Sequence, residues 1–228
     1  MDRITCIIPA FNEAPRILDV LKPLQGASQI HDILVVDDGS LDDTCAVVQA
    51  YLPQDPRVSL FHLRQNSGKG AAFFHGVEHS TGELILMLDA DLIGFHTSHI
   101  DILIQPVLAG DCDMTIGLFK GGEWKTDLSH KATPWLSGQR CLRRELLSGI
   151  SHPAARGYGL EVALSAAARL QGMKTLYVSL PGVSHPVSEV HRGSPVKGFF
   201  HRLNMYGDIL RAVAITRQER RHSRVRRA

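Results

Sequence analysis

Apolar residues along the chain form short, nearly continuous runs that alternate with stretches of helical periodicity. Runs of this kind predict strands buried on both faces, and they cover residues 3–10, 32–37, 57–63, 83–89, 113–119 and 174–180. Helical spacing predicts helices over residues 13–24, 41–52, 71–80, 98–110, 139–150 and 159–173. Strand and helix alternate with short joints, which predicts an α/β fold with a mostly parallel sheet and helices on both of its faces.

Capping residues predict where two of these helices begin. Asn12 would cap the first helix, and capping of the second helix by Asp38, Ser40 or Asp42 is the alternative to a role of these residues in nucleotide binding, although both roles can hold. A further amphipathic helix is predicted from about Lys197 to Thr216. Its apolar positions are Phe200, Leu203, Tyr206, Leu210 and Val213.

Polar motifs follow four of the predicted strands. They are "PAFNE", "DDGS", "NSGKG" and "DAD", in chain order. Parallel strands point their carboxyl ends to one edge of a sheet, and ligands bind beyond that edge. The four motifs therefore predict one shared site.

The "DAD" motif places two carboxylates directly after an apolar strand. Asp89 and Asp91 at this spacing can face one site, where their like charges repel unless a cation is present. A hard divalent cation such as Mg²⁺ takes carboxylates and completes its shell with water and phosphate oxygens. The motif thus indicates a metal that holds a diphosphate. Two solvated loop acids are the alternative.

The "DDGS" and "NSGKG" motifs suit a nucleotide. Asp37 and Asp38 could accept hydrogen bonds from ribose hydroxyls or a base N–H. Lys69, between two glycines, could approach phosphate charge. A plain glycine turn is an equal alternative for this loop. The spacing is not that of a P-loop, which argues against a P-loop NTPase.

Composition agrees with a globular protein. The 228 residues are 44% hydrophobic and 21% charged. No apolar run reaches 18 residues, and the N-terminus lacks a signal-peptide pattern. The four cysteines have no metal-type spacing, which favours reduced thiols in a cytoplasmic protein.

Charge is unevenly distributed. Residues 197–228 hold nine basic and two acidic residues, whereas the remainder holds 16 basic and 21 acidic residues. This basic end could lie on an anionic membrane surface, pack in a homodimer interface, or remain solvated. Nucleic-acid binding is not expected, because no stacking aromatics interleave with the terminal charge.

The motifs "IIPAFNE", "VVDDGSLDDT", "NSGKG" and "LDADL", in this order, resemble the family 2 type glycosyltransferases with the Rossmann-like GT-A fold. The later blocks "SGQRCLRRELL", "GYGLEVAL" and "GVSH" look like the glucosyl-3-phosphoglycerate synthase group. The resemblance spans about residues 4 to 185. It implies a UDP-sugar as donor, with Mg²⁺ or Mn²⁺.

The resemblance also implies roles for particular residues. The residues implied to line the uracil pocket with Asp38 are Pro9, Ala10, Phe11 and Glu13. Lys69 would contact the nucleotide, and Asp89, Ala90 and Asp91 would hold ribose, metal and diphosphate. Asp91 would be the principal carboxylate ligand, His185 a further metal ligand, and Glu161 would lie near the sugar and the acceptor. His191 competes with His185 as ligand, and Glu161 could instead simply favour a helix N-terminus.

The acceptor does not carry over. Residues 119–135 do not match the segment that carries acceptor contacts in the phosphoglycerate enzymes. The resemblance therefore leaves the acceptor as an unknown small molecule or lipid, and leaves retention or inversion of the sugar open.

We expect a metal-dependent glycosyltransferase, a hexosyltransferase that moves a sugar from a UDP-sugar to an unidentified acceptor, and glucose is the sugar we expect. The alternatives are a nucleotidyltransferase that forms a nucleotide-sugar and a non-catalytic UDP-sugar-binding protein. We assign residues 1–120 to the nucleotide-sugar-binding half, 121–194 to an acceptor-side half of the same domain with C-terminal helices, and 195–228 to the amphipathic helix and basic tail. The expected location is cytoplasmic, with peripheral membrane contact as a variant of it.

Overall fold

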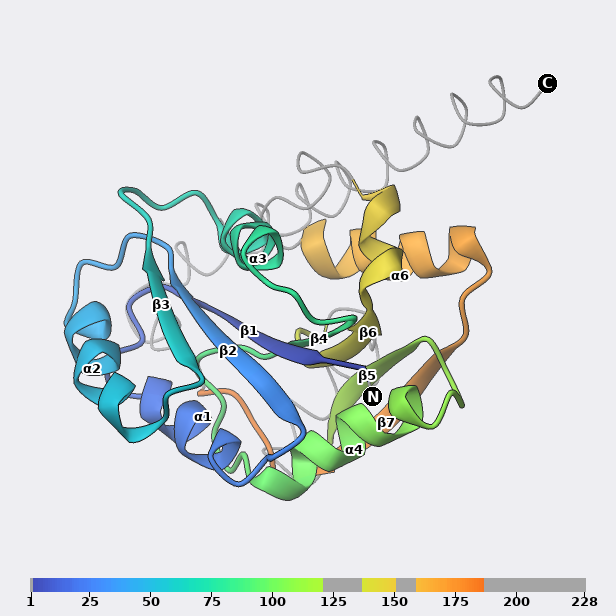
Figure 1. The fold of residues 1–228 in the computed structure, drawn as a ribbon, viewed down its shortest axis with the longest axis horizontal. Coiled ribbons are helices and arrows are strands. Elements are labelled where there is room, and N and C mark those ends of the chain that lie inside the picture. The colour runs from blue at the N-terminus through green and yellow to red at the C-terminus, as the bar shows by residue number, and fades with distance from the viewer. Residues whose placement is uncertain (1, 121–136, 151–158, 187–228) are drawn as a thin grey trace, which may run out of the picture.

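One sheet organises the chain, with its strands in the order β3-β2-β1-β4-β6-β5-β7 (Figure 1). The computed structural model describes residues 2–120, 137–150 and 159–186. Its strands are β1 (Ile4–Ala10), β2 (Ile30–Asp37), β3 (Val58–His62), β4 (Leu84–Met87), β5 (Met114–Lys120), β6 (Arg140–Arg143) and β7 (Thr175–Pro181). Strand β6 is antiparallel to its neighbours β4 and β5, and the other pairings are parallel. The predicted α/β class with a mostly parallel sheet is confirmed.

Helices cover both faces of this sheet. They are α1 (Ile17–Leu24), α2 (Thr44–Tyr51), α3 (Lys69–Glu78), α4 (Thr97–Leu108) and α6 (Gly159–Gln171), with 3₁₀ turns η1 (Leu52–Gln54) and η3 (Arg144–Gly149). Helices α1, α2 and α4 pack on one face, and α3 and α6 pack on the other (Figure 1). This arrangement makes two hydrophobic cores that share the sheet as a wall.

The sequence of β1 shows why its strand is apolar throughout. Cys6 and Ile8 point into the core under α1, α2 and α4, whereas Ile7 points into the core under α3 and α6. A strand buried on both faces cannot alternate apolar and polar residues. Helix α3 approaches this strand closely at Gly76, where an added Cβ would lie 2.6 Å from Ile7 Cγ2.

The predicted helix over residues 139–150 is wrong. The chain there forms β6 and then the 3₁₀ turn η3. Cys141 faces one core and Leu142 the other, so the segment has the two-residue period of a strand. Pairing with β4 and β5 satisfies backbone groups on both of those strands, and this gain overrides local helix propensity.

The predicted helix caps are also revised. Helix α1 begins at Ile17, and Asn12 lies before it with a φ of 57°. The Asn12 side chain instead accepts a hydrogen bond from Leu41 N at 2.8 Å, and Asn12 N donates to Ser40 Oγ at 2.9 Å. Asn12 therefore joins two loops rather than capping a helix.

Helix α2 begins at Thr44, later than predicted. Of the three candidate caps, Asp42 contacts its first turn, where Asp42 Oδ1 accepts from Thr44 N at 3.0 Å. Asp38 is used elsewhere, as described below. The predicted amphipathic helix, the basic tail, both tryptophans and His191 lie outside the described residues.

Arg57, directly before β3, holds the end of α1 and the start of β2 together. Its guanidinium forms two hydrogen bonds with Asp55, at 2.9 and 2.7 Å. It also donates to three backbone carbonyls from the end of α1 to the start of β2, those of Leu24, Ala27 and Ile30. The Asp55 side chain is 5% exposed, so the pair is largely removed from water.

We predict that Arg57→Met lowers the free energy of unfolding by about 2–3 kcal/mol, because the largely buried Asp55 carboxylate loses its guanidinium partner and three backbone carbonyls lose the hydrogen bonds that the guanidinium donates. Urea unfolding would measure the change. Arg3→Met is the matched control, because the Arg3–Asp32 pair is exposed and its loss should cost no more than about 0.5 kcal/mol.

The same pair predicts a pH dependence. Hydrogen bonding from Arg57 lowers the pKa of Asp55. The pair's contribution is therefore present above the unfolded-state pKa of about 3.9 and is lost as pH falls through the lower folded-state pKa. The free energy of unfolding, measured from neutral to acid pH, should fall less on acidification in Arg57→Met than in the wild type. Equal acid losses would contradict this role of the pair.

Candidate functional site

The loops after β1, β2 and β3 are joined at the carboxyl edge of the sheet. Asp38 N donates to Ala10 O at 2.8 Å, which continues the pairing of β1 with β2 past their ends. Ser67 N and Gly68 N donate to the two carboxylate oxygens of Asp38, at 2.8 and 2.7 Å. The structure thus brings the predicted motifs to one rim.

Asp38 is nearly buried by this arrangement. Burial raises the pKa of Asp38, against the effect of the two amides that donate to its carboxylate. Its neighbour Asp37 is fully buried, and Asp37 Oδ2 lies 2.6 Å from His62 Nδ1. The oxygens of both acids are thus already used to hold the loops after β2 and β3.

The remaining residues implied to bind the nucleotide lie on the same rim. Pro9 and Ala10 end β1, and Phe11 follows it with 40% of its surface exposed. Glu13 N donates to Thr44 Oγ1 at 2.8 Å, which places Glu13 beside the start of α2. Burial raises the pKa of Glu13, and the nearby charge of Asp91 adds to this shift.

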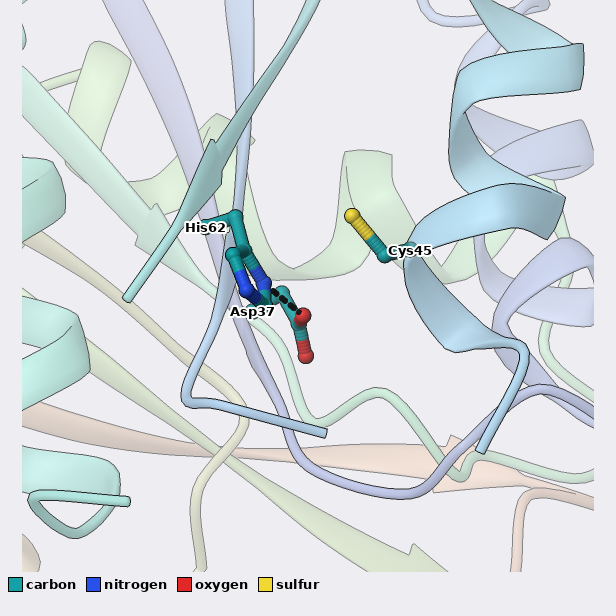
Figure 2. Close-up of side chains that lie close together, drawn as sticks. All are labelled: Asp37, Cys45 and His62. Carbon is teal, nitrogen blue, oxygen red and sulfur yellow. Dashed lines mark hydrogen bonds and ion pairs between the residues drawn. The ribbon is translucent and has the colours of Figure 1, made fainter. Parts of the chain in front are cut away.

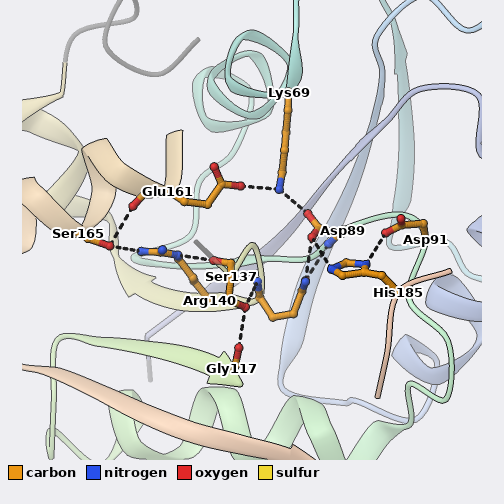
Figure 3. A network of polar contacts seen from close by, with 10 residues as sticks. Lys69, Asp89, Asp91, Gly117, Ser137, Arg140, Glu161, Ser165 and His185 are labelled. Carbon is orange, nitrogen blue, oxygen red and sulfur yellow. Dashed lines mark hydrogen bonds and ion pairs between the residues drawn. The ribbon is translucent and has the colours of Figure 1, made fainter. Parts of the chain in front are cut away.

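Three potential metal ligands meet after β4 and β7. One ligand atom from each of Asp89, Asp91 and His185 lies within 4.8 Å of the other two. His185 Nδ1 is 3.0 Å from Asp91 Oδ1, and His185 Nε2 is 3.6 Å from Asp89 Oδ2 (Figure 3). Ala90, between the two acids, is buried.

His185 lies 94 positions after Asp91 in the chain, and backbone pairing brings it next to the "DAD" motif. Ile93 and Ser184 exchange two backbone hydrogen bonds, at 2.9 and 3.0 Å. This bridge ties the loop after β4 to the loop after β7 and places His185 next to Asp91. The His185 ring also lies edge-on to Phe119, with centroids 4.8 Å apart.

The charge of this group suits a cation. Burial alone would lower the pKa of His185, but the carboxylates of Asp91 and Asp89 raise it overall. Two carboxylate oxygens and an imidazole nitrogen are ligands that Mg²⁺ or Mn²⁺ accepts, the imidazole suiting Mn²⁺ better. The three residues therefore fit the divalent metal that the sequence predicts.

Lys69 joins this group to α6. As the first residue of α3, it places Nζ 2.5 Å from Asp89 Oδ1 and 2.6 Å from Glu161 Oε1 (Figure 3). Burial alone would lower the pKa of Lys69, but the two carboxylates raise it. Burial would likewise raise the pKa of Asp89, but Lys69, His185 and Gln139 lower it to about 2.

Glu161 lies in the first turn of α6 and is 2% exposed. Its Oε1 binds Lys69, whereas its Oε2 has no hydrogen-bond partner within the described part of the chain. A buried carboxylate oxygen without a donor is costly. Glu161 Oε2 is therefore the atom of this network best suited to accept a hydrogen bond from a ligand hydroxyl.

Sequence reasoning missed Gln139. This fully buried residue donates from Nε2 to Asp89 Oδ2 at 2.8 Å, and its Oε1 accepts from Asp89 N at 3.0 Å. It thus fixes both the backbone and the side chain of Asp89. Before it, Gly138 leaves the space that this packing needs, because an added Cβ would lie 2.5 Å from both Asp89 oxygens.

Sequence reasoning also missed Arg140, which is fully buried in β6. It donates to Ser137 O at 2.8 Å and to Ser165 Oγ at 3.0 Å, and Ser165 Oγ donates to Glu161 O at 2.9 Å (Figure 3). Burial lowers the pKa of Arg140 to about 10, against the effect of Glu161. Arg140 therefore connects the strand that orients Asp89 to the helix that carries Glu161. The segment "RCLR" does not alternate polar and apolar residues, so the local sequence pattern gave no signal for it.

The chain belongs to glycosyl transferase family 2, which matches residues 5–162. Dolichyl-phosphate beta-glucosyltransferase ALG5C of Trichomonas vaginalis is 40% identical over 96 residues, which are 38% of this chain and 28% of that protein. Glucosyl-3-phosphoglycerate synthase of Mycobacterium tuberculosis is 27% identical over 194 residues, which are 71% of this chain and 59% of that protein. Both matches span less than two thirds of the relative's own length.

Solved structures share the fold. The crystal structure of glucosyl-3-phosphoglycerate synthase from Mycobacterium tuberculosis with Mg²⁺ and UDP has a TM-score of 0.74 at 23% identity. The comparison covers 94% of this chain and 79% of that one. The complex of the same enzyme with Mn²⁺, UDP-glucose and phosphoglyceric acid has a TM-score of 0.73 at 22% identity, with 92% and 80% covered. The GT-A fold that the motifs imply is thereby confirmed.

Two further expectations concern the whole chain. All four cysteines are free, as expected for reduced thiols. Within residues 2–120, 137–150 and 159–186, no helix combines the length and the apolar character that crossing a bilayer requires.

We predict that Gln139→Leu weakens Mn²⁺ binding about tenfold or more, because Asp89 loses the amide that orients it. Calorimetric titration of Mn²⁺ in the presence of UDP would measure this loss. Gln139→Glu should weaken binding as well, because it places a second carboxylate against Asp89.

Gln105→Leu is the matched control for these variants, because Gln105 is exposed on α4. Circular dichroism would establish that each variant is folded. Unchanged Mn²⁺ affinity in folded Gln139→Leu would show that Gln139 does not orient a metal ligand.

Proposed function

We propose that the chain is a metal-dependent hexosyltransferase that moves a sugar, glucose in the first instance, from a UDP-sugar to an acceptor. The observation that carries the proposal is the meeting of Asp89, Asp91 and His185 beside Lys69 and Glu161. Membership of glycosyl transferase family 2 supports the reaction class. Both named relatives are glucose-transferring enzymes by name, which supports glucose.

The donor nucleotide would lie on the rim formed by the loops after β1 and β2. The uracil pocket would be lined by Asp38 together with Pro9, Ala10, Phe11 and Glu13. Asp37 would lie behind this lining and support it. Ribose and diphosphate would extend toward Asp89, Ala90 and Asp91. The backbone hydrogen bonds between these loops support a preformed pocket, because they fix the rim without a ligand.

Asp91 and His185 would hold the cation, with Asp89 beside them. When bound, a Mg²⁺ or Mn²⁺ ion supplies positive charge that stabilises the departing diphosphate. Lys69 would add a second positive charge on the other side of Asp89. Since Lys69 already contacts two carboxylates, its ammonium is oriented before the donor arrives.

Glu161 would bind the transferred sugar or the acceptor hydroxyl through Oε2. That oxygen lacks a donor in the described structure, whereas Oε1 is held by Lys69. In this position Glu161 could orient a hydroxyl or receive its proton.

The acceptor side belongs to the second half of the chain in this proposal. Residues 121–194 would form it, next to the nucleotide-sugar-binding half at residues 1–120, and residues 195–228 would contact a membrane surface or a second copy. The two named relatives use a phosphorylated lipid and phosphoglycerate by name, so both classes are reasonable first acceptors. We propose a cytoplasmic location, peripheral to a membrane if the acceptor is a lipid.

We predict that the protein releases UDP from UDP-glucose in the presence of Mg²⁺ or Mn²⁺. Adding dolichyl phosphate or 3-phosphoglycerate as acceptor should increase this release. A coupled UDP assay across donors would measure this. Pyrophosphate release from UTP and a sugar phosphate would instead show a nucleotidyltransferase. Calorimetric UDP binding without turnover with any acceptor would show a binding protein.

We further predict that Asp91→Ala lowers metal-dependent turnover at least about a hundredfold, because the cation loses its principal carboxylate. Asp111→Ala is the matched control, because Asp111 is exposed in the turn before β5, at the opposite edge of the sheet. Steady-state kinetics at saturating Mn²⁺ would test both variants. Full activity of Asp91→Ala would refute the proposed role of the metal.

A further inference from the structure

A second group of potential metal ligands lies at the carboxyl ends of β2 and β3. It consists of Asp37 at the end of β2, His62 at the end of β3 and Cys45 in the first turn of α2 (Figure 2). One ligand atom from each lies within 4.8 Å of the other two. Strand β1 separates this group from the strand that leads to Asp89.

The ligand chemistry of this group differs from that of the first. Asp89, Asp91 and His185 offer two oxygens and one nitrogen, whereas Asp37, Cys45 and His62 offer oxygen, sulfur and nitrogen. Sulfur and imidazole together favour Zn²⁺ and Co²⁺ over Mg²⁺. The second group therefore selects a softer cation than the first.

The existing contacts hold part of the group in place. Asp37 is fully buried, and Ser40 donates to its Oδ1 from both the backbone N and Oγ. Asp37 Oδ2 and His62 Nδ1 are 2.6 Å apart. The carboxylate is thus oriented toward His62, and the Cys45 side chain extends toward the same pair (Figure 2).

The rearrangement that a metal requires is small. Ligands of a tetrahedral zinc are about 3.5 Å apart, given bond lengths of 2.0–2.3 Å. The widest separation in the group is at most 4.8 Å, so the side chains would move by no more than about 1.3 Å. His62 has a half-exposed side chain and Cys45 is only partly buried, which gives both room to turn.

We propose that Asp37, Cys45 and His62 bind a Zn²⁺-class cation, with Cys45 as thiolate and the fourth position open. On binding the cation, the Cys45 thiol would release its proton to water and ligate through the thiolate sulfur, and His62 would ligate through a ring nitrogen that carries no proton. This step rests on the proposed function, which places the uracil at Asp38 and makes Asp37 the support of that wall: a cation that draws Asp37 toward Cys45 and His62 would weaken donor binding. The second group is then an inhibitory site that Zn²⁺ fills and Mg²⁺ does not.

Cobalt absorption tests the site without any activity. The full chain is saturated with Mg²⁺ and titrated with Co²⁺, and we expect a near-ultraviolet thiolate-to-cobalt band that saturates at one equivalent. Cys45→Ser should abolish the band, and His62→Gln should weaken Co²⁺ binding about tenfold or more. His79→Gln is the control for an exposed histidine and should leave the titration unchanged. A wild-type chain without the band would overturn the proposal.

Alkylation of the wild-type chain gives a second test that needs no variant. Cys45 is partly exposed, whereas Cys6, Cys112 and Cys141 are buried, so iodoacetamide should react first at Cys45. Equimolar Zn²⁺ in excess Mg²⁺ should slow this reaction at least about tenfold, as read by mass spectrometry of the peptides. An unchanged rate would overturn the proposal.

Inhibition is tested separately, so that failure of the proposed function and failure of this inference are distinguishable. Zn²⁺ should inhibit UDP release by the wild type in excess Mn²⁺ and should inhibit Cys45→Ser at least about tenfold less. Equal inhibition of both would overturn the inhibitory role of the site. A chain that shows the cobalt band but has no transferase activity would retain the metal site and lose only the proposed function.

Discussion

The ion pair of Lys69 with Asp89 is the interaction on which the candidate site depends. Asp89 follows an apolar strand and is largely taken out of water there, which would be unfavourable without a nearby positive charge. Lys69 supplies that charge at 2.5 Å and meets Glu161 on its other side. A single ammonium thus lies between the two carboxylates and links the loop after β4 to α6.

This interaction also explains why the second half of the chain is built as it is. Strand β6 runs antiparallel between β4 and β5, and this direction brings Gln139 and Gly138 to the end of β4 where Asp89 lies. Arg140, the next residue, then fixes the helix that carries Glu161. The antiparallel strand is therefore the element that connects α6 to Asp89.

The parallel part of the fold and the rim of the site were predictable from the sequence, because buried strands and their polar ends leave a local pattern. Asp89 and Asp91 follow such a strand, and Lys69 follows another. The antiparallel strand was not predictable from the same pattern. Its residues have helix propensity, and only the unpaired edges of β4 and β5, which form far away in the sequence, decide its conformation.

Which residues contact one another within the site was less predictable than which residues belong to it. The pairing of His185 with Asp91 rests on the backbone bridge of Ile93 and Ser184, which joins segments remote in sequence. Two clusters follow from the same edge of the same sheet, yet they present different donor atoms to a cation. Oxygen ligands at Asp89 and Asp91 favour a hard ion that also binds phosphate, whereas the thiol of Cys45 favours a softer one. Because the chemistry of the ligands rather than the fold separates the two groups, the proposed roles of an activating and an inhibitory metal would be distinguished at one rim by donor atoms alone.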